Sequence, residues 1–163
     1  MWCVRLFFVY LHILFQTKDV KVEFGMNVLF STEGLIRNPY IKTVLFIIIG
    51  GFAYCGIEVL TRGYSHISMF FTGGLCFLLV GGISYWLGEN VPLVVKMLLG
   101  AFIITMAELI TGLIVNVWLD LGVWDYSRQR FNYMGQICLM FSAMWFLLSL
   151  PIIGVYRVVD RIL

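Results

Sequence analysis

The sequence predicts an all-α membrane bundle of four transmembrane helices, and three observations lead to this fold class. First, 61% of the 163 residues are hydrophobic and only 12% are charged, with a mean hydropathy of +0.97, whereas an ordinary soluble domain carries about 25% charged residues. Second, the apolar residues gather in four long runs. Third, no run alternates as a barrel strand does. Because an open strand cannot satisfy its backbone in lipid, each run is expected to be a helix.

The composition also excludes several classes of protein. The chain has 11 Lys and Arg and 9 Asp and Glu side chains, which are too few to give it a surface that water would wet. A soluble enzyme, a nucleic-acid-binding protein and a disordered chain are therefore excluded. The net charge of +2 is too small to indicate a polyanionic partner. Membrane lipid is the expected partner, and nucleic acid is not.

The four runs are each long enough to cross a hydrocarbon core about 30 Å thick, which takes about 20 helical residues. The predicted spans are Thr43–Leu60, Ile67–Leu87, Leu93–Leu119 and Gly135–Tyr156. Pro92 is expected at the start of the third helix, where its missing N–H costs nothing. Pro151 lies inside the fourth run and is expected to kink it.

The first 40 residues are expected to lie apart from a single transmembrane domain over residues 41–163. The apolar stretch Trp2–Phe15 is short for a span and lacks the cleavage site of a signal peptide. It is either an interfacial or short first helix, which would make a fifth helix, or a stretch outside the native product, with Met26 as the true start. We expect one of these alternatives rather than a fifth full span.

The Lys and Arg residues near the ends of the spans predict the orientation in the cell membrane. One side receives Arg37, Lys42, Lys96, Arg157 and Arg161. The other side receives only Arg62, Arg128 and Arg130. We therefore expect a multi-pass protein with both termini in the cytoplasm, and with the loops Thr61–His66 and Asp120–Met134 facing outward.

The first and third runs are similar at an offset of fifty positions. The residues that recur are Gly50, Phe52, Glu58 and Thr61, matched by Gly100, Phe102, Glu108 and Thr111. The second and fourth runs share a fainter similarity, between Gly74-Leu75-Cys76 and Gln136-Ile137-Cys138. This period predicts a parallel duplication of a helical hairpin, with halves of about 43–90 and 93–157. Coincidence between two glycine-rich membrane helices is the alternative.

Two glutamates inside the spans are the strongest candidates for function. The duplication would place Glu58 and Glu108 at matched depth, about 24 Å along their helices, facing each other in the outer third of the bilayer. A carboxylate at the bilayer centre costs about 3 kcal/mol on insertion scales, and it normally faces a partner or a wet cavity. Glu108, Gly112, Asn116 and Asp120 recur every four residues, which predicts one polar stripe. An interhelical hydrogen-bond seam is the structural alternative for this stripe.

The first outward loop adds two further candidates. Arg62 follows Glu58 by four positions and is its natural counter-ion. A histidine can exchange a proton or ligate a metal, so His66 is a candidate for either role, although a plain polar anchor is an equal alternative. The only other histidine is His12, so no metal site is predicted.

The second outward loop supplies Trp124, Asp125 and Gln136. An aromatic belt at the headgroup level explains Trp124, but it does not explain the two polar residues. Asp125 is expected either to pair with an arginine or to contact a ligand. The chain contains no C-x-x-C, no phosphate-binding G-x-x-x-x-G-K-[ST] and no G-x-S-x-G or H-E-x-x-H, so no cofactor is predicted.

Several motifs, in their order and spacing, resemble those of a known family. They are Arg62-Gly63-Tyr64-Ser65-His66-x-Ser68-Met69, Gly73-Gly74-x-x-Phe77, Glu108-x-x-x-Gly112-x-x-x-Asn116, Trp124-Asp125-Tyr126-Ser127 and Asn132-x-x-Gly135-Gln136-x-Cys138. From about Phe46 to Phe146 the chain resembles the putative ABC-transporter type IV family, also called putative ABC transporter permease, and is similar to the vertebrate transmembrane protein 229 group. Thr61 and Arg130 depart from its pattern, which has Trp and Pro there. The resemblance implies a small polytopic membrane protein with a transport label, without an established substrate.

The favoured hypothesis is a transport-type membrane protein with an outward-facing polar cavity. Glu58 and Glu108 would bind a cation, a proton or a small cationic solute there. The residues that would gate the cavity or complete the site are Arg62, His66, Asn116, Trp124, Asp125 and Gln136. A homo-oligomer is expected because four spans are few for a permease, and a separate ATPase subunit is implied by the resemblance alone.

Two alternatives stay open beside transport. Paired carboxylates can act as acid and base, so an intramembrane enzyme that acts on a lipid or isoprenoid headgroup is one of them. A non-catalytic membrane scaffold is the other. The sequence favours a protein without enzyme activity and leaves the solute and the direction of transport undetermined.

Overall fold

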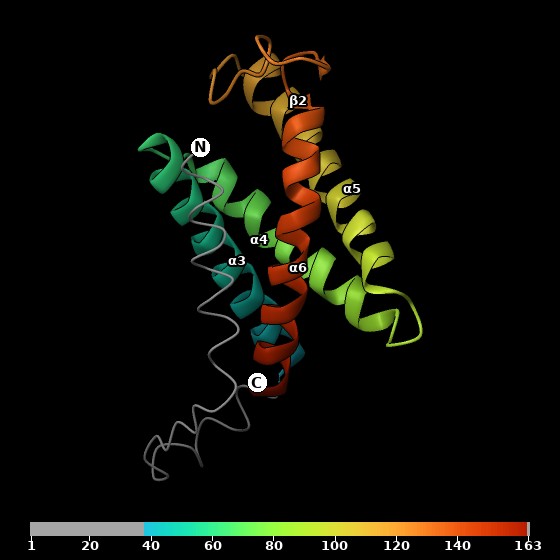
Figure 1. Ribbon diagram of the computed structural model, residues 1–163. Coiled ribbons are helices and arrows are strands. Elements are labelled where there is room, and N and C mark those ends of the chain that lie inside the picture. Colours follow the sequence, from blue (N-terminus) through green and yellow to red (C-terminus); the bar gives the residue numbers. More distant parts are fainter. Residues whose placement is uncertain (1–37, 163) are drawn as a thin grey trace.

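The computed structural model describes residues 38–162, and four long helices run up and down in this part of the chain (Figure 1). They are α3 (Pro39–Arg62), α4 (Ile67–Trp86), α5 (Leu93–Gly112) and α6 (Leu139–Ile162). A π-helical turn, η2 (Leu113–Trp118), extends α5, and a hairpin of β1 (Asn132–Tyr133) and β2 (Ile137–Cys138) precedes α6. All four spans, with η2 counted in the third, are long and apolar enough to cross a membrane. The predicted all-α bundle of four membrane helices is therefore confirmed.

The predicted N-terminal segment, residues 1–40, lies outside the described residues except for its last three. These three residues begin the first span four positions earlier than predicted. The Asn38 side chain accepts a hydrogen bond from the Tyr40 amide at 3.0 Å, and Pro39 occupies the first turn, which are two start signals of a helix. The helix ends at Arg62 because Gly63 has a φ of 83°, a left-handed conformation that suits glycine after a helix.

The fourth helix begins at Leu139 and not at the predicted Gly135. Residues 132–138 form an antiparallel hairpin in which Asn132 pairs with Cys138 and Tyr133 with Ile137. Met134 and Gly135, with φ of 52° and 69°, make the turn, and a right-handed helix cannot include such residues. The faint similarity between the second and fourth spans therefore joins a helical segment to a strand. The duplication as a whole stays a prediction.

The third span reaches Trp118, but its last turn is π-helical rather than α-helical. This wider coil shifts the register of the polar stripe at its end. Asp120 lies beyond the helix, exposed, with a φ of 51°. The stripe that was predicted to run through four residues therefore ends at Asn116.

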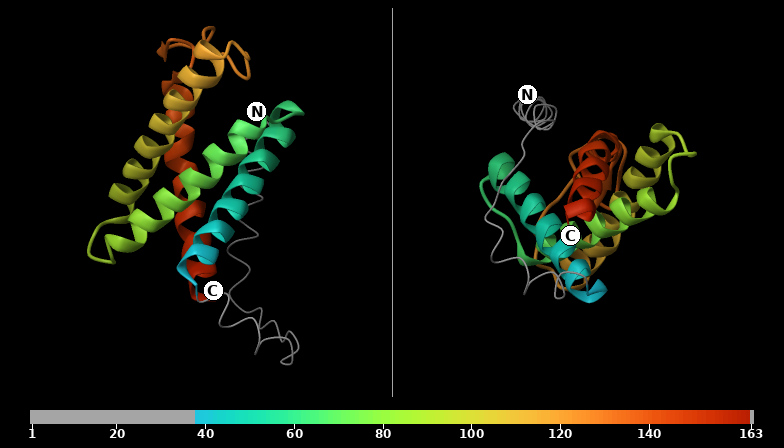
Figure 2. Two further views of the ribbon diagram at one scale, coloured as in Figure 1. Left: turned by 180° about the vertical axis from the view of Figure 1, so that it is seen from behind. Right: turned by 90° about the horizontal axis from the view of Figure 1, so that it is seen from below.

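The helix α4 crosses the bundle obliquely and packs against each of the other three helices (Figures 1 and 2). Its contact with α3 is close because both helices carry glycines there. A Cβ added at Gly50 would collide with Phe77, and one added at Gly74 would collide with the backbone of Ile47. Small residues of this kind let membrane helices approach each other closely.

The two ends of the bundle differ in their contacts. The start of α3 and the end of α6 lie together, as the ion pair between Lys42 Nζ and Asp160 Oδ1 at 2.8 Å shows; we call this the terminal end. The loops 63–66 and 119–138 lie at the opposite end, the loop end (Figure 1). The candidate site residues are in the half of the bundle at the loop end. Which end faces the cytoplasm stays a prediction.

Candidate functional site

Glu108 is the most deeply buried ionisable side chain of the described site, with 1% of its surface exposed. Its Oε2 atom accepts a hydrogen bond from the Trp145 indole N–H at 2.6 Å, and its Oε1 atom accepts one from the Tyr54 hydroxyl at 3.5 Å. The carboxyl group of α5 is thus held by one donor from α6 and one from α3. Both donors are neutral groups.

No basic side chain pairs with Glu108 in residues 38–162. The ion pairs of this part of the chain join Lys42 to Asp160 and Arg62 to Glu58. On the terminal side of Glu108 lies the apolar core of Cys76, Val80, Met97, Ile104, Trp145 and Ile153. Glu108 therefore sits at the edge of an apolar core with hydrogen bonds but without a counter-ion among the described residues.

Glu58 is also buried, with 8% exposed, but its surroundings differ. The Arg62 guanidinium, one turn later on α3, forms an ion pair with one oxygen, and the Ser65 hydroxyl donates to the other at 2.5 Å. This confirms the ion pair predicted from the spacing of four residues. Arg62 also donates to the Val123 carbonyl at 3.2 Å. Glu58 therefore has a counter-ion, whereas Glu108 has none within residues 38–162.

Both glutamates point into the protein, but they do not bind each other. Tyr54 connects their surroundings: it lies one turn before Glu58 on α3 and donates to Glu108. A buried apolar cluster of Met69, Val115, Val123 and Trp124 packs against Tyr54. Two surface pockets, of about 370 and 280 Å³, are lined by other residues.

Asn116, Trp124 and Gln136 form a third hydrogen-bonded group, which ties the second loop to the third span. Asn116 Nδ2 donates to Gln136 Oε1 at 2.8 Å and to the Trp124 carbonyl at 3.0 Å, and its Oδ1 accepts from the Val123 amide at 2.7 Å. Trp124 Nε1 donates to the Gln136 carbonyl at 3.0 Å. A Cβ at Gly112 would contact Gln136 Oε1, so this glycine makes room for the loop.

The position of Trp124 differs from the aromatic belt that the sequence predicts. Only 6% of its surface is exposed, because the loop folds back and its indole N–H binds within the protein. The donors and acceptors of Asn116 are likewise used within the protein, but by Val123, Trp124 and Gln136 of the second loop and not by a neighbouring helix.

His66 and Asp125 make local contacts at the loop end. His66 Nδ1 caps α4 by accepting from the Ser68 amide at 3.3 Å, and it lies 2.8 Å from the Ser68 hydroxyl. Asp125 is exposed and accepts from the amide and the hydroxyl of Ser127, each at 2.8 Å. These two hydrogen bonds lower the pKa of Asp125. Among the described residues, no arginine lies within ion-pair distance of it.

The structure adds two polar partners that the sequence reasoning missed, Tyr54 and Trp145, and it joins Ser65 of the first loop to Glu58. Tyr54 was detectable, since it precedes Glu58 by four positions and so lies on the same face of α3. Trp145 was not, because only the packing of α6 against α5 brings it to Glu108. Within residues 38–162, no three His, Cys, Asp or Glu side chains come together as a metal site would require.

A comparison with protein families gives a match over most of the chain. The family described as "Putative ABC-transporter type IV" matches residues 28–162. The match extends at both ends beyond the predicted stretch from Phe46 to Phe146, and it includes residues 28–40 of the predicted N-terminal segment. No curated protein and no solved structure matches the chain.

Proposed function

Because the chain belongs to the family described as "Putative ABC-transporter type IV", we propose that it is a transport component in which Glu108 binds a proton or the cationic group of a solute. The family and the four apolar helices fit a multi-pass membrane protein of transport type. The observation that carries the finer proposal is the buried Glu108 carboxyl group, which has two neutral donors and no basic partner within residues 38–162.

The reason is electrostatic. Burying an ionised carboxylate costs several kcal/mol unless a positive charge compensates it. Tyr54 and Trp145 orient the carboxyl group of Glu108 but bring no charge. A proton or a cationic solute would supply the missing charge, and it would do so where α3, α5 and α6 meet. Binding at Glu108 would then change the contacts that α5 makes with α3 and α6.

Arg62 is the residue that we assign to gating. Its guanidinium joins Glu58 on α3 to the Val123 carbonyl of the second loop. Release of the Val123 contact would separate this loop from the α3–α4 hairpin and give access toward Tyr54 and Glu108.

The remaining candidate residues have supporting roles in this proposal. Asn116, Trp124 and Gln136 hold the second loop over the third span, and His66 fixes the start of α4. Asp125 is the exposed carboxylate of the same loop, and we assign it to the entrance, where it would attract a cation.

Flux through reconstituted protein tests the proposal. The full chain is placed in liposomes that contain a pH-sensitive dye, and the fluxes of protons and of methylammonium are measured. Glu108→Gln should abolish the flux that the wild type shows. Its amide oxygen can still accept a hydrogen bond from Trp145. Glu89→Gln, an exposed acid at the terminal end, is the matched control and should behave as the wild type. Equal flux in both variants would reject the proposal.

A separate ATPase is the partner that we propose from the family. The chain contains no G-x-x-x-x-G-K-[ST] motif, so another subunit would have to bind the nucleotide. With both termini in the cytoplasm, that subunit would dock at the terminal end, near Lys42 and Arg161. Copurification of an ATPase with the tagged protein, and its loss when these two residues are changed to Glu, would support this docking.

The alternative of an intramembrane enzyme is favoured by one observation, the unequal environments of the two carboxyl groups. An acid and a base need such a difference, and Glu58 is ion-paired whereas Glu108 is not. Lipid extracts from cells with and without the gene distinguish the alternatives. A changed lipid or isoprenoid species favours the enzyme, and an unchanged profile favours transport. If the protein is a scaffold, Glu108→Ala should impair its assembly, and even the wild type should show no flux.

A further inference from the structure

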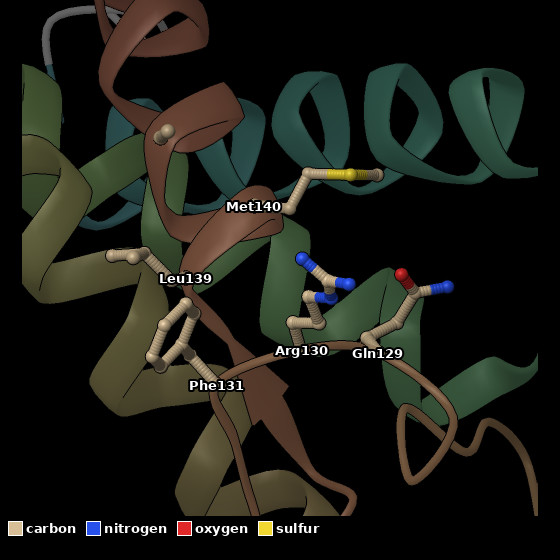
Figure 3. Close-up of a pocket in the computed structure, with 6 residues that line it drawn as sticks. Gln129, Arg130, Phe131, Leu139 and Met140 are labelled. Carbon is tan, nitrogen blue, oxygen red and sulfur yellow. The ribbon is translucent and has the colours of Figure 1, made fainter.

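A pocket of about 370 Å³ lies between the second loop and the first turns of α6, separate from Glu108 (Figure 3). Its lining residues are Gln129, Arg130, Phe131, Leu139, Met140 and Ala143. We propose that this pocket binds one anionic phospholipid, whose phosphate contacts Arg130 and whose acyl chain lies along Leu139, Met140 and Ala143.

The apolar wall of the pocket faces away from the protein core. The exposed fraction is 80% for Phe131, 61% for Leu139 and 54% for Met140. Leu139 and Met140 open a helix that is long and apolar enough to cross a membrane, so this wall lies at the boundary between headgroups and acyl chains. Tyr133 and Met134 on the same loop are also more than half exposed. An acyl chain is the apolar partner available at this depth.

Arg130 gives the pocket its only charge. Its side chain has no hydrogen bond and no ion pair with any residue from 38 to 162, and Figure 3 shows it extending toward Met140 with Gln129 beside it. No acidic residue lines the pocket. A guanidinium presents a planar set of donors that matches a phosphate group. The Gln129 amide is a further donor at the same edge.

The combination of one arginine with an apolar wall favours an amphiphile over a free anion. A free phosphate would meet one arginine and gain nothing from the apolar wall. An acyl chain gains little by leaving other acyl chains for this wall, since lipid tails are as apolar as the side chains. The wall therefore positions the lipid, and Arg130 selects its headgroup.

Lipid binding to the purified full chain tests the proposal. Native mass spectrometry would count the phosphatidylglycerol and phosphatidylcholine molecules that stay bound. Arg130→Gln should weaken phosphatidylglycerol binding about fivefold, the effect of one arginine near a charged lipid surface, and should leave phosphatidylcholine binding unchanged. Arg128→Gln is the matched control, because Arg128 is exposed on the same loop and does not line the pocket.

Three results would overturn the proposal. Equal losses in the two arginine variants would show non-specific attraction, and no loss in Arg130→Gln would remove the phosphate contact. Displacement of the lipid by millimolar inorganic phosphate would also contradict the proposal, because it would identify a free anion as the ligand.

A second pair of variants tests the acyl-chain wall. Ala143→Phe would fill the pocket from α6 and should lower the number of bound phosphatidylglycerol molecules. Ala53→Phe, at an exposed alanine of α3 outside the pocket, should leave that number unchanged. If Ala143→Phe binds as many lipids as the control, the proposed pocket is wrong. Equal melting temperatures of the two variants establish that both fold.

Discussion

The Trp145 indole N–H donates to Glu108 Oε2 over 2.6 Å, and this bond joins α6 to α5 inside the bundle. Trp145 also stacks on Tyr54 of α3, with ring centroids 5.9 Å apart. Tyr54 donates to the other oxygen of the same carboxyl group. One buried acid therefore organises three helices, which is why its substitution should affect both stability and function.

Removal of the indole donor should be costly. Trp145→Phe keeps most of the aromatic surface but leaves Glu108 with one long hydrogen bond. We expect a loss of about 2 kcal/mol in the free energy of unfolding, because a buried acceptor that loses its partner costs about 1 to 3 kcal/mol. Trp118→Phe, at a tryptophan that is 79% exposed, is the control. Denaturation in detergent measures the free energy of unfolding of both variants, and equal stabilities would contradict the role of Trp145.

The Arg62–Glu58 pair should show strong coupling. Arg62→Gln leaves Glu58 buried without its counter-ion, so we expect a loss of about 3 kcal/mol. The double variant Glu58→Gln, Arg62→Gln should recover part of this loss, because no unpaired charge remains. A double-mutant cycle on the unfolding free energy gives the coupling directly. Additive losses would contradict the compensation of Glu58 by Arg62.

Gly112 should resist substitution more than Gly56, a glycine of α3 with open space around it. Gly112→Ala places a methyl group against Gln136 Oε1, so we expect the second loop to loosen and its proteolysis to become faster. At Gly56 a Cβ would meet nothing within 4 Å, so Gly56→Ala should raise stability by up to about 1 kcal/mol. Limited proteolysis of both variants checks this contrast. Equal cleavage rates would show that Gln136 does not need the space.

The stability of the turn at Asp125 in the second loop should depend on pH only at acidic pH. The hydrogen bonds from Ser127 lower the pKa of Asp125, so their contribution is fully present above the unfolded pKa of about 3.9. It is lost as the pH falls through the lower folded value. Amide exchange at Ser127, corrected for its intrinsic pH dependence, should show constant protection from pH 5 to 8 and reduced protection below pH 4. Asp125→Asn should show reduced protection at every pH.

The architecture was predictable because lipid imposes length and polarity on every span. The four helices follow from this constraint. Their predicted bounds are wrong where local signals differ from hydropathy. Asn38 and Pro39 extend α3, while the left-handed residues Met134 and Gly135 delay α6. The π-helical turn of η2 has no comparable signal in the sequence.

The candidate site was predictable only in part. The spacing of Glu58 and Arg62 is local, and their ion pair follows from the helix repeat. The partners of Glu108 are not local, because Trp145 reaches it only through tertiary packing. An aromatic belt is predicted for Trp124 because its residue type and its place near the end of a span fit one. The fold of the loop buries this side chain instead.

Infrared difference spectroscopy observes the carboxyl group of Glu108 itself, and so it detects a proton or a cation that binds there. Spectra of the reconstituted wild type and of Glu108→Gln would be compared as pH is varied and as methylammonium is added. We expect a carboxyl band that changes with pH or with the amine in the wild type and is absent in Glu108→Gln. Identical difference spectra from the two proteins would contradict the claim that Glu108 exchanges a proton or a cation.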